Sequence, residues 1–481
     1  MWWFLNHHII ILFIKITFMS KKIYFVFFFF FFYLIYAKCQ KYDNNWVLGI
    51  DTLVKKERKP YWKNVISFGE NTLDVNKITS IESIMSSYNL SASDSLGNLI
   101  FYFNGLKVFN RENLVMTNGD SIGYFMDTRY WRQRNRYCGC IFGHLENPIG
   151  ILPTSVKFIP LPGHKHQFLV FAPLVWNTKG FSSYDVLSYI RIDMDLSEGL
   201  GTVIEKNQLV LDSHIDGFGL VQHSNGIDWW LVAPVFMKNI FYKYLITRDG
   251  ILGPQKQIIY PEITSSPSSG DTPIFVKVTS TQYGNFSPDG KLFIRNELHN
   301  GIFIYDFDRC TGELTFKRKI KNVLSPLELE FSPNSKYIYF TSGKNLYQVD
   351  LESSNNENNS IFITTLPSYS AIELGPDGKI YFTYYKPGGS KYMGYINRPN
   401  LPRLSCDFKP FGIELPYESN IALPQFPNYR LGIETNYNCN ERDSIFIPYG
   451  EAINYKVENK DYIRVDRYKL ITDESWKDLF K

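Results

Sequence analysis

The sequence predicts an all-β protein, a β-propeller of seven blades, with six blades as the alternative count. Three observations support this fold class. Turn segments of one pattern recur at spacings of 45 and 43 residues, aromatic residues make up 17% of the chain, and no long stretch after the N-terminal segment has the apolar period of a helix. A period of about 40–50 residues is that of one four-stranded propeller blade, and aromatic side chains pack well on pleated strands.

The repeated turns read FSPDGK from Phe286, FSPNSK from Phe331 and LGPDGK from Leu374. Proline fixes φ where each turn begins, and Asp-Gly or Asn-Ser turns the chain back. The residues expected to form these turns are Pro288, Asp289, Gly290, Pro333, Asn334, Pro376, Asp377 and Gly378. Each turn is followed by two predicted strands, which lie at 292–295 and 301–307, 337–341 and 345–351, and 380–384 and 392–397.

Three weaker copies of this pattern lie upstream, at 94–98, 162–166 and 224–228. Each precedes a strand-like run, and their wider spacing indicates longer loops in the early blades. The largest insertion is expected at about 111–150. Together the six copies mark six blades.

A seventh blade is expected to join both ends of the chain. Residues 46–49 and 65–68 are strand-like but belong to no marked blade, and residues 420–426 are strand-like near the other end. Pairing these segments would close the last blade with N- and C-terminal strands and would leave no large exposed sheet edge.

The N-terminus has the pattern of an export signal. Lys21 and Lys22 precede an apolar run at 23–36, which is short for a membrane span, and Met19 gives a well-formed start. A membrane anchor is the alternative. The predicted organisation is a signal peptide at 1–39, a propeller at 40–432 and a polar tail at 433–481.

Loss of residues 1–39 would remove four lysines and no acidic residue, so the net charge would fall from +4 to 0. The basicity of the chain therefore belongs to the signal, and no nucleic-acid partner is expected. Cleavage after Cys39 is the favoured interpretation, and a lipid on Cys39 is the alternative link to a membrane.

The six cysteines include no C-x-x-C pair, so a zinc ribbon or a thioredoxin-like site is not indicated. An exported chain can form disulfides. Cys310 and Cys406 are expected to have structural roles, buried or in a disulfide.

Six segments occur in the same order in a group of exported bacterial propellers. They are 45–49 (NWVLG), 94–102 (DSLGNLIFY), 194–206 (MDLSEGLGTVIEK), 305–312 (YDFDRCTG), 346–351 (LYQVDL) and 423–426 (LPQF). Over residues 45–432 the chain thus resembles the exported WD40-like β-propeller proteins of Bacteroidota, some of them associated with gliding motility or type IX secretion. The resemblance implies a secreted or cell-surface protein. The tail of 42 residues after Cys439 lacks a clear Gly-rich sorting pattern, and the family offers no catalytic residues to carry over.

Two sets of residues are candidates for a binding or metal site. In the 111–150 insertion, alternating arginines beside aromatic residues would share one strand face and could hold an anionic glycan or an acidic partner; a solvated charged edge is the alternative. These residues are Trp131, Arg132, Arg134, Arg136 and Tyr137. The histidine-containing segments His164-Lys165-His166 and Asp212 to Asp216 (around His214) are interpreted as surface turns, so no metal and no cofactor are predicted.

The sequence contains no G-x-S-x-G elbow, no Walker-type loop and no H-E-x-x-H helix. The expected function is therefore that of an exported, non-enzymatic binding or scaffold propeller at the cell envelope, which recognises a protein or glycan through its loop faces. One alternative is a lactonase-, glycosidase- or lyase-like enzyme with its site at the channel mouth, which three converging Asp, Glu or His residues would indicate. Another is a surface lipoprotein in polysaccharide uptake.

Overall fold

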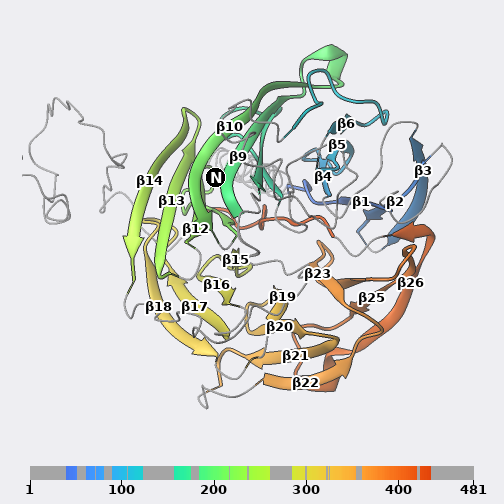
Figure 1. The fold of residues 1–481 in the computed structure, drawn as a ribbon, viewed down its shortest axis with the longest axis vertical. Helices are drawn as coiled ribbons and strands as arrows, with labels where there is room; N and C mark the ends of the chain where they lie inside the picture. Colours follow the sequence, from blue (N-terminus) through green and yellow to red (C-terminus); the bar gives the residue numbers. More distant parts are fainter. Residues whose placement is uncertain are drawn as a thin grey trace, which may run out of the picture.

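The structure, a computed structural model, places seven antiparallel sheets around a common axis (Figure 1), which confirms the predicted all-β, seven-bladed propeller. It describes residues 40–434 apart from 51–60, 71, 81–88, 106, 123–155, 175–183, 216, 236–237, 260–283, 298–300, 321–322, 324–325, 354–359 and 420–422. No helix in this part of the chain is long and apolar enough to cross a membrane.

The sheets follow one another in chain order. Blades 1 and 2 have three described strands each: β1 (Asn45–Gly49), β2 (Tyr61–Phe68) and β3 (Leu73–Ser80), then β4 (Leu90–Ser93), β5 (Leu99–Phe103) and β6 (Val108–Asn110). Blades 3 and 4 have four: β7 (Lys157–Pro160), β8 (Gln167–Leu174), β9 (Tyr184–Asp193) and β10 (Thr202–Ile215), then β11 (Gly219–Gln222), β12 (Trp229–Pro234), β13 (Ile240–Thr247) and β14 (Gly250–Ile258).

Blades 5 to 7 also have four strands and contain the three best copies of the turn. Blade 5 is β15 (Gly284–Phe286), β16 (Leu292–Glu297), β17 (Gly301–Phe307) and β18 (Leu314–Ile320). Blade 6 is β19 (Pro326–Phe331), β20 (Tyr337–Ser342), β21 (Asn345–Asp350) and β22 (Ser360–Thr365). Blade 7 is β23 (Ser370–Leu374), β24 (Ile380–Tyr384), β25 (Ser390–Ile396) and β26 (Phe408–Ser419). Two 3-10 turns, η1 (Ser197–Gly199) and η2 (Arg403–Cys406), complete the described elements.

The repeated turn joins the first two strands of a blade. In blade 5, Leu292 N donates to Ser287 Oγ at 2.9 Å and Lys291 N to Asp289 Oδ1 at 3.1 Å. In blade 6, Tyr337 N donates in the same way to Ser332 Oγ at 2.8 Å. The side chains of the motif therefore satisfy the backbone of a tight reversal, as its sequence predicts.

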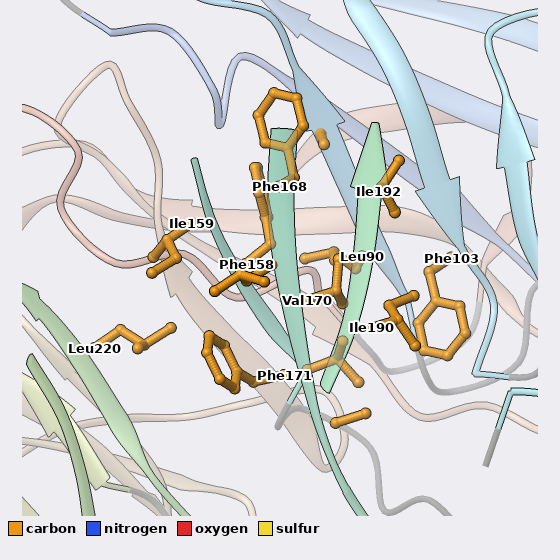
Figure 2. Packing of buried hydrophobic residues seen from close by; sticks show 14 of the residues in the cluster. Leu90, Phe103, Phe158, Ile159, Phe168, Val170, Phe171, Ile190, Ile192 and Leu220 are labelled. Carbon is orange, nitrogen blue, oxygen red and sulfur yellow. The ribbon is translucent and has the colours of Figure 1, made fainter. Parts of the chain in front are cut away.

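The core lies between neighbouring blades. Figure 2 shows Phe158 and Phe171 of blade 3 between Leu90 of blade 2 and Leu220 of blade 4. All four side chains are buried. Because both faces of a blade pack on neighbours, its strands are apolar on both sides, and β12 (WWLVAP) is buried along its whole length.

Ring closure differs from the expectation of a blade completed by a C-terminal strand. The first sheet is built from β1, β2 and β3 alone among the described strands, and the described residues 423–434 are not in strand conformation. Pro424 and Pro427 have no N–H to donate to a ladder, which accounts for the difference. The C-terminal residues instead contribute side chains: Leu423 and Phe426 pack against Trp46 of β1.

The position of β1 explains why the side chains of Leu423 and Phe426 are needed to fill the first blade. Asn45 N donates to Ser93 Oγ at 3.2 Å and Val47 N to Ser91 Oγ at 3.3 Å, so β1 runs opposite to β4. The innermost strands of blades 6 and 7 run parallel instead, since Leu374 N at the end of β23 donates to Glu330 near the end of β19. β1 therefore takes the place of a second strand, and the C-terminal residues lie where an innermost strand would be.

Candidate functional site

Residues 423–434, here named the C-terminal latch, cross the middle of the ring (Figure 1). They contact blades 1, 3, 4, 5 and 7. Two aromatic side chains anchor them. Phe426 stacks on Trp46 with ring centroids 6.1 Å apart and meets Phe158 edge-on at 6.2 Å.

Tyr429 is the deeper anchor, with 1% of its surface exposed. Its ring contacts Tyr42, Phe158 and Trp229 at centroid distances of 5.3, 5.4 and 5.8 Å. Its hydroxyl donates to Phe158 O at 2.8 Å. Burial raises the pKa of this phenol well above its usual range, so Tyr429 stays neutral and serves as a hydrogen-bond donor.

Polar contacts hold the rest of the latch. Arg430 forms a bidentate pair with Asp43, at 2.7 Å from Nη1 to Oδ2 and 2.6 Å from Nη2 to Oδ1. Gly432 N donates to Gln222 Oε1 at 2.8 Å, and Gly432 O accepts from Arg309 Nη2 at 2.6 Å. The C-terminal latch is thus fixed by two aromatic anchors, one ion pair and its own backbone.

A set of buried ionisable residues lies on the innermost strands, and one of its members contacts the C-terminal latch. We call Lys157 of β7, Glu328 and Glu330 of β19, and Glu373 of β23 the axial cluster; each is at most 4% exposed. Glu373 Oε1 accepts from Phe426 N at 3.1 Å, so the cluster and the C-terminal latch are in direct contact.

Glu330 and Glu373 both accept hydrogen bonds from backbone N–H groups. Glu330 accepts from Phe331 N at 2.7 Å and from Leu374 N of the next blade at 3.3 Å. Burial raises the pKa of Glu330 to about 7, against the lowering effect of these N–H groups and of Lys157. Burial and the neighbouring Glu330 raise the pKa of Glu373 well above its usual range. Burial therefore favours the neutral form of both carboxyls, as it does for any buried acid.

Lys157 is the cation of the cluster. Its Nζ donates to Phe218 O at 3.0 Å and Gly284 O at 3.1 Å, which ties β7 to the starts of blades 4 and 5. Burial lowers the pKa of Lys157 to about 8, and the carboxyls Glu373 and Glu330 act in the opposite direction. Paired carboxyls and an amine with shifted pKa values have the chemistry of acid–base catalysis, but here each is buried and bonded to backbone.

Sequence reasoning missed the axial cluster, although a signal was present. Asn285, Glu330 and Glu373 each stand immediately before the repeated turn, at F-S-P, F-S-P and L-G-P. Asn285 Oδ1 accepts from Phe286 N at 3.0 Å, the same contact that Glu330 makes with Phe331 N. Extending the repeat by one residue toward the N-terminus would have shown a recurrent polar position on an innermost strand.

The residues singled out from sequence lie in several places. Trp131, Arg132, Arg134, Arg136 and Tyr137 fall outside the described residues, as does Asp216. His166 is exposed and contacts Asp195 at 2.5 Å from Nδ1 to Oδ1. His164 is in the same turn, and Asp212 is exposed on β10. Among the described residues, no group of three or more His, Cys, Asp or Glu side chains has metal-binding geometry.

Both cysteines expected to be structural have such roles. Cys310 is buried and disulfide-bonded. Cys406 is a free thiol with no exposed surface, packed between blades 6 and 7, and burial raises its pKa. The turn residues Pro288 to Gly290, Pro333, Asn334 and Pro376 to Gly378 lie between the first and second strands of blades 5, 6 and 7.

No protein-family model and no curated protein matches the chain. Several solved structures are similar in fold. A functionally unknown protein from Desulfotomaculum acetoxidans is 12% identical, with 79% of this chain and 99% of that chain covered and a TM-score of 0.38. A Bacteroides fragilis protein proposed to be a 6-phosphogluconolactonase is 12% identical, with 67% and 99% covered and a TM-score of 0.33. The propeller of Dos1 is 12% identical, with 71% and 90% covered and a TM-score of 0.31.

Proposed function

We propose that this protein is an exported, non-enzymatic binding or scaffold propeller at the cell envelope or surface, which recognises a protein or glycan through its loop faces. The observation that carries the proposal is the C-terminal latch. Phe426 N of the latch is bonded to Glu373 of the axial cluster, so this carboxyl already has a partner within the folded chain. The loops around the ring, held in place by seven rigid sheets, remain as the recognition surface.

Two features support export. The segment from Met19 to Cys39 has the basic and apolar regions of a signal peptide. The disulfide at Cys310 suits an oxidising compartment, since disulfides are rare where thiols are kept reduced. The resemblance to the exported propellers of Bacteroidota motivates a location at the cell surface.

The proposal is tested by retention on anionic polysaccharide. The variant Arg132→Ala/Arg134→Ala/Arg136→Ala is expected to lose retention, because these alternating arginines are the residues that the sequence proposes for anion binding. A matched variant, Lys256→Ala/Lys386→Ala/Lys391→Ala, removes three exposed positive charges elsewhere and should bind like the unmodified protein. Equal loss in both variants would show nonspecific charge attraction, and recovery of the protein only from the cytoplasm would exclude the envelope location.

A second candidate function rests on the axial cluster. Three glutamates and a lysine interact electrostatically on the innermost strands, and the shifted pKa values of Glu330 and Glu373 suit a general acid and a general base. A lactonase, glycosidase or lyase would use them once the latch moved aside. Hydrolysis of a lactone or glycoside panel that disappears in Glu330→Gln and in Glu373→Gln would favour the enzyme over the binding protein.

The third alternative, a surface lipoprotein in polysaccharide uptake, depends on Cys39, which lies outside the described residues. The intact mass of the mature protein distinguishes it. A diacylglyceryl adduct on Cys39 would establish lipidation, and a mass beginning at Gln40 would exclude it.

A further inference from the structure

The C-terminal latch is held in the way that a folded domain holds a bound peptide. Its described residues belong to no strand: the chain turns at Tyr429 and Arg430, and Pro424 and Pro427 have no N–H to donate to a ladder. Its contacts come instead from a few large anchors. Aromatic and arginine anchors of this kind dominate the energy of peptide and protein interfaces.

The two aromatic anchors fix the spacing of the motif. Phe426 lies against Trp46 and Phe158, and Tyr429, three residues later, is enclosed by Tyr42, Phe158 and Trp229. The Tyr429 hydroxyl reaches Phe158 O, so the site accepts a phenol at its base. An apolar residue at the first position and tyrosine at the fourth are therefore preferred.

The next position is selected by charge. Asp43 is the partner of Arg430, with 7% of its side chain exposed against 27% for the arginine. A buried carboxylate with bidentate geometry requires the planar guanidinium. Lysine at this position would make one contact in place of two.

Most of the remaining contacts are made by the backbone of the latch. Phe426 N donates to Glu373, Gly432 N to Gln222, and Glu434 N to Ser224 O at 3.0 Å. Asn428 adds one side-chain bond, from Nδ2 to Pro288 O at 2.6 Å, whereas Ile433 is 69% exposed and its side chain adds little. The backbone contacts accept many sequences, provided that the peptide follows the same backbone path.

Resting on the proposed binding function, we propose that the surface beneath the C-terminal latch is a peptide-recognition site, occupied by the latch as an intramolecular ligand. Its partner is a segment that follows the same backbone path, with an aromatic residue, two further residues, tyrosine and arginine in the order seen from Phe426 to Arg430. Only residues 420–422 separate the latch from the end of β26. A linker this short gives a tethered ligand an effective concentration on the order of millimolar, so the partner segment binds when the latch is released.

The test uses the full chain with a protease-cleavage sequence in place of residues 420–422. After cleavage, a fluorescent peptide with the sequence of residues 423–434 is added and its anisotropy followed. The cleaved protein is expected to exchange its latch for the labelled peptide, and the uncleaved protein to bind about a hundredfold less. The peptide variants Tyr429→Ala and Arg430→Ala should each bind about thirtyfold more weakly, whereas Ile433→Ala, at an exposed position, should bind like the parent.

The other outcomes exclude the proposal. If the cleaved chain keeps its propeller, by circular dichroism and thermal melting, but takes up no labelled peptide, the latch is only a ring-closing segment. If the chain unfolds as the latch dissociates, the latch belongs to the core. The loop-face proposal is measured separately, by polysaccharide retention of the arginine variants, so it can stand when this one fails.

Discussion

Buried cations are the most distinctive individual residues of this propeller, because each joins one blade to the next. Lys243 Nζ of blade 4 donates to Gly312 O of blade 5 at 2.7 Å, and burial lowers its pKa to about 8. Arg309 of blade 5 donates to Gln222 O of blade 4 at 2.8 Å. Long cationic side chains thus satisfy backbone carbonyls at the junctions where sheet ladders cannot reach.

Lys63 differs from these cations, because its hydrogen-bond partner among the described residues is a phenol and not a carbonyl or carboxylate. Its Nζ donates to Tyr102 OH at 3.0 Å and lies over the rings of Tyr102 and Phe109, 4.8 and 5.7 Å from their centroids. Burial lowers the pKa of Lys63 to about 7 from the usual 10.5. The folded protein therefore binds fewer protons at this site than the unfolded chain does between about pH 7 and pH 10.5.

This difference gives a pH dependence with a defined sign. The free energy of unfolding should rise with pH across that window, because below pH 7 the folded state must bury a charged amine. Lys63→Met removes the charge, keeps the chain length, and should stabilise the protein at pH 6 by on the order of 2 kcal/mol. Urea unfolding of both proteins at pH 6 and pH 9 measures the difference in the free energy of unfolding. Lys256→Met, at an exposed site on β14, is the control, and an equal gain there would contradict the assignment.

At the scale of the element, turns and their neighbours decide how blades fit together. Gly312 lies in the turn between β17 and β18 at φ +68°, and a Cβ there would come within 2.8 Å of the Trp230 ring of blade 4. Gly343 has a similar φ of +60°, but a Cβ added there would have no described atom within 4 Å. A substitution at Gly343 therefore meets backbone strain alone, whereas one at Gly312 meets backbone strain and a clash with the neighbouring blade.

The pair therefore makes a matched test. Gly343→Ala should cost about 1 kcal/mol, from left-handed backbone strain alone. Gly312→Ala should cost about 2–4 kcal/mol, because the methyl group must also displace the Trp230 ring. Chemical denaturation of both variants at one pH measures the difference. Equal costs would mean that the Trp230 ring moves aside freely and that this turn does not fix the blade interface.

The sequence predicts an element correctly where neighbouring residues alone determine its conformation. Pro-Asp-Gly and Pro-Asn-Ser turns encode their own hydrogen bonds, so the hairpins that begin at Pro288, Pro333 and Pro376 can be identified. The apolar run before Phe426 (NIALPQF, 420–426) is strand-like, whereas the prolines on either side of Phe426 decide its conformation. Glu330 and Glu373 escape prediction because glutamate usually lies at the surface, and only the folded ring brings their strands together.

At the scale of the whole molecule, the ring closes by packing and not by a shared sheet. β26 lies next to β2 and β3, and the C-terminal latch fills the innermost place beside β1. The same segment contacts Glu373 of the axial cluster and pairs with Asp43, so the segment that closes the ring is also part of the candidate site. A substitution that loosens the latch would therefore affect stability and recognition together.

The Asp43–Arg430 pair also limits how early the ring can close during synthesis of the chain. These partners are 387 residues apart in the chain. Trp46 leaves the ribosome early, yet the aromatic ring that stacks on it, Phe426, is made much later. Contacts of such long range form slowly, and a first blade without its partners exposes apolar surface. The ring therefore cannot close before residues 423–434 have been synthesised.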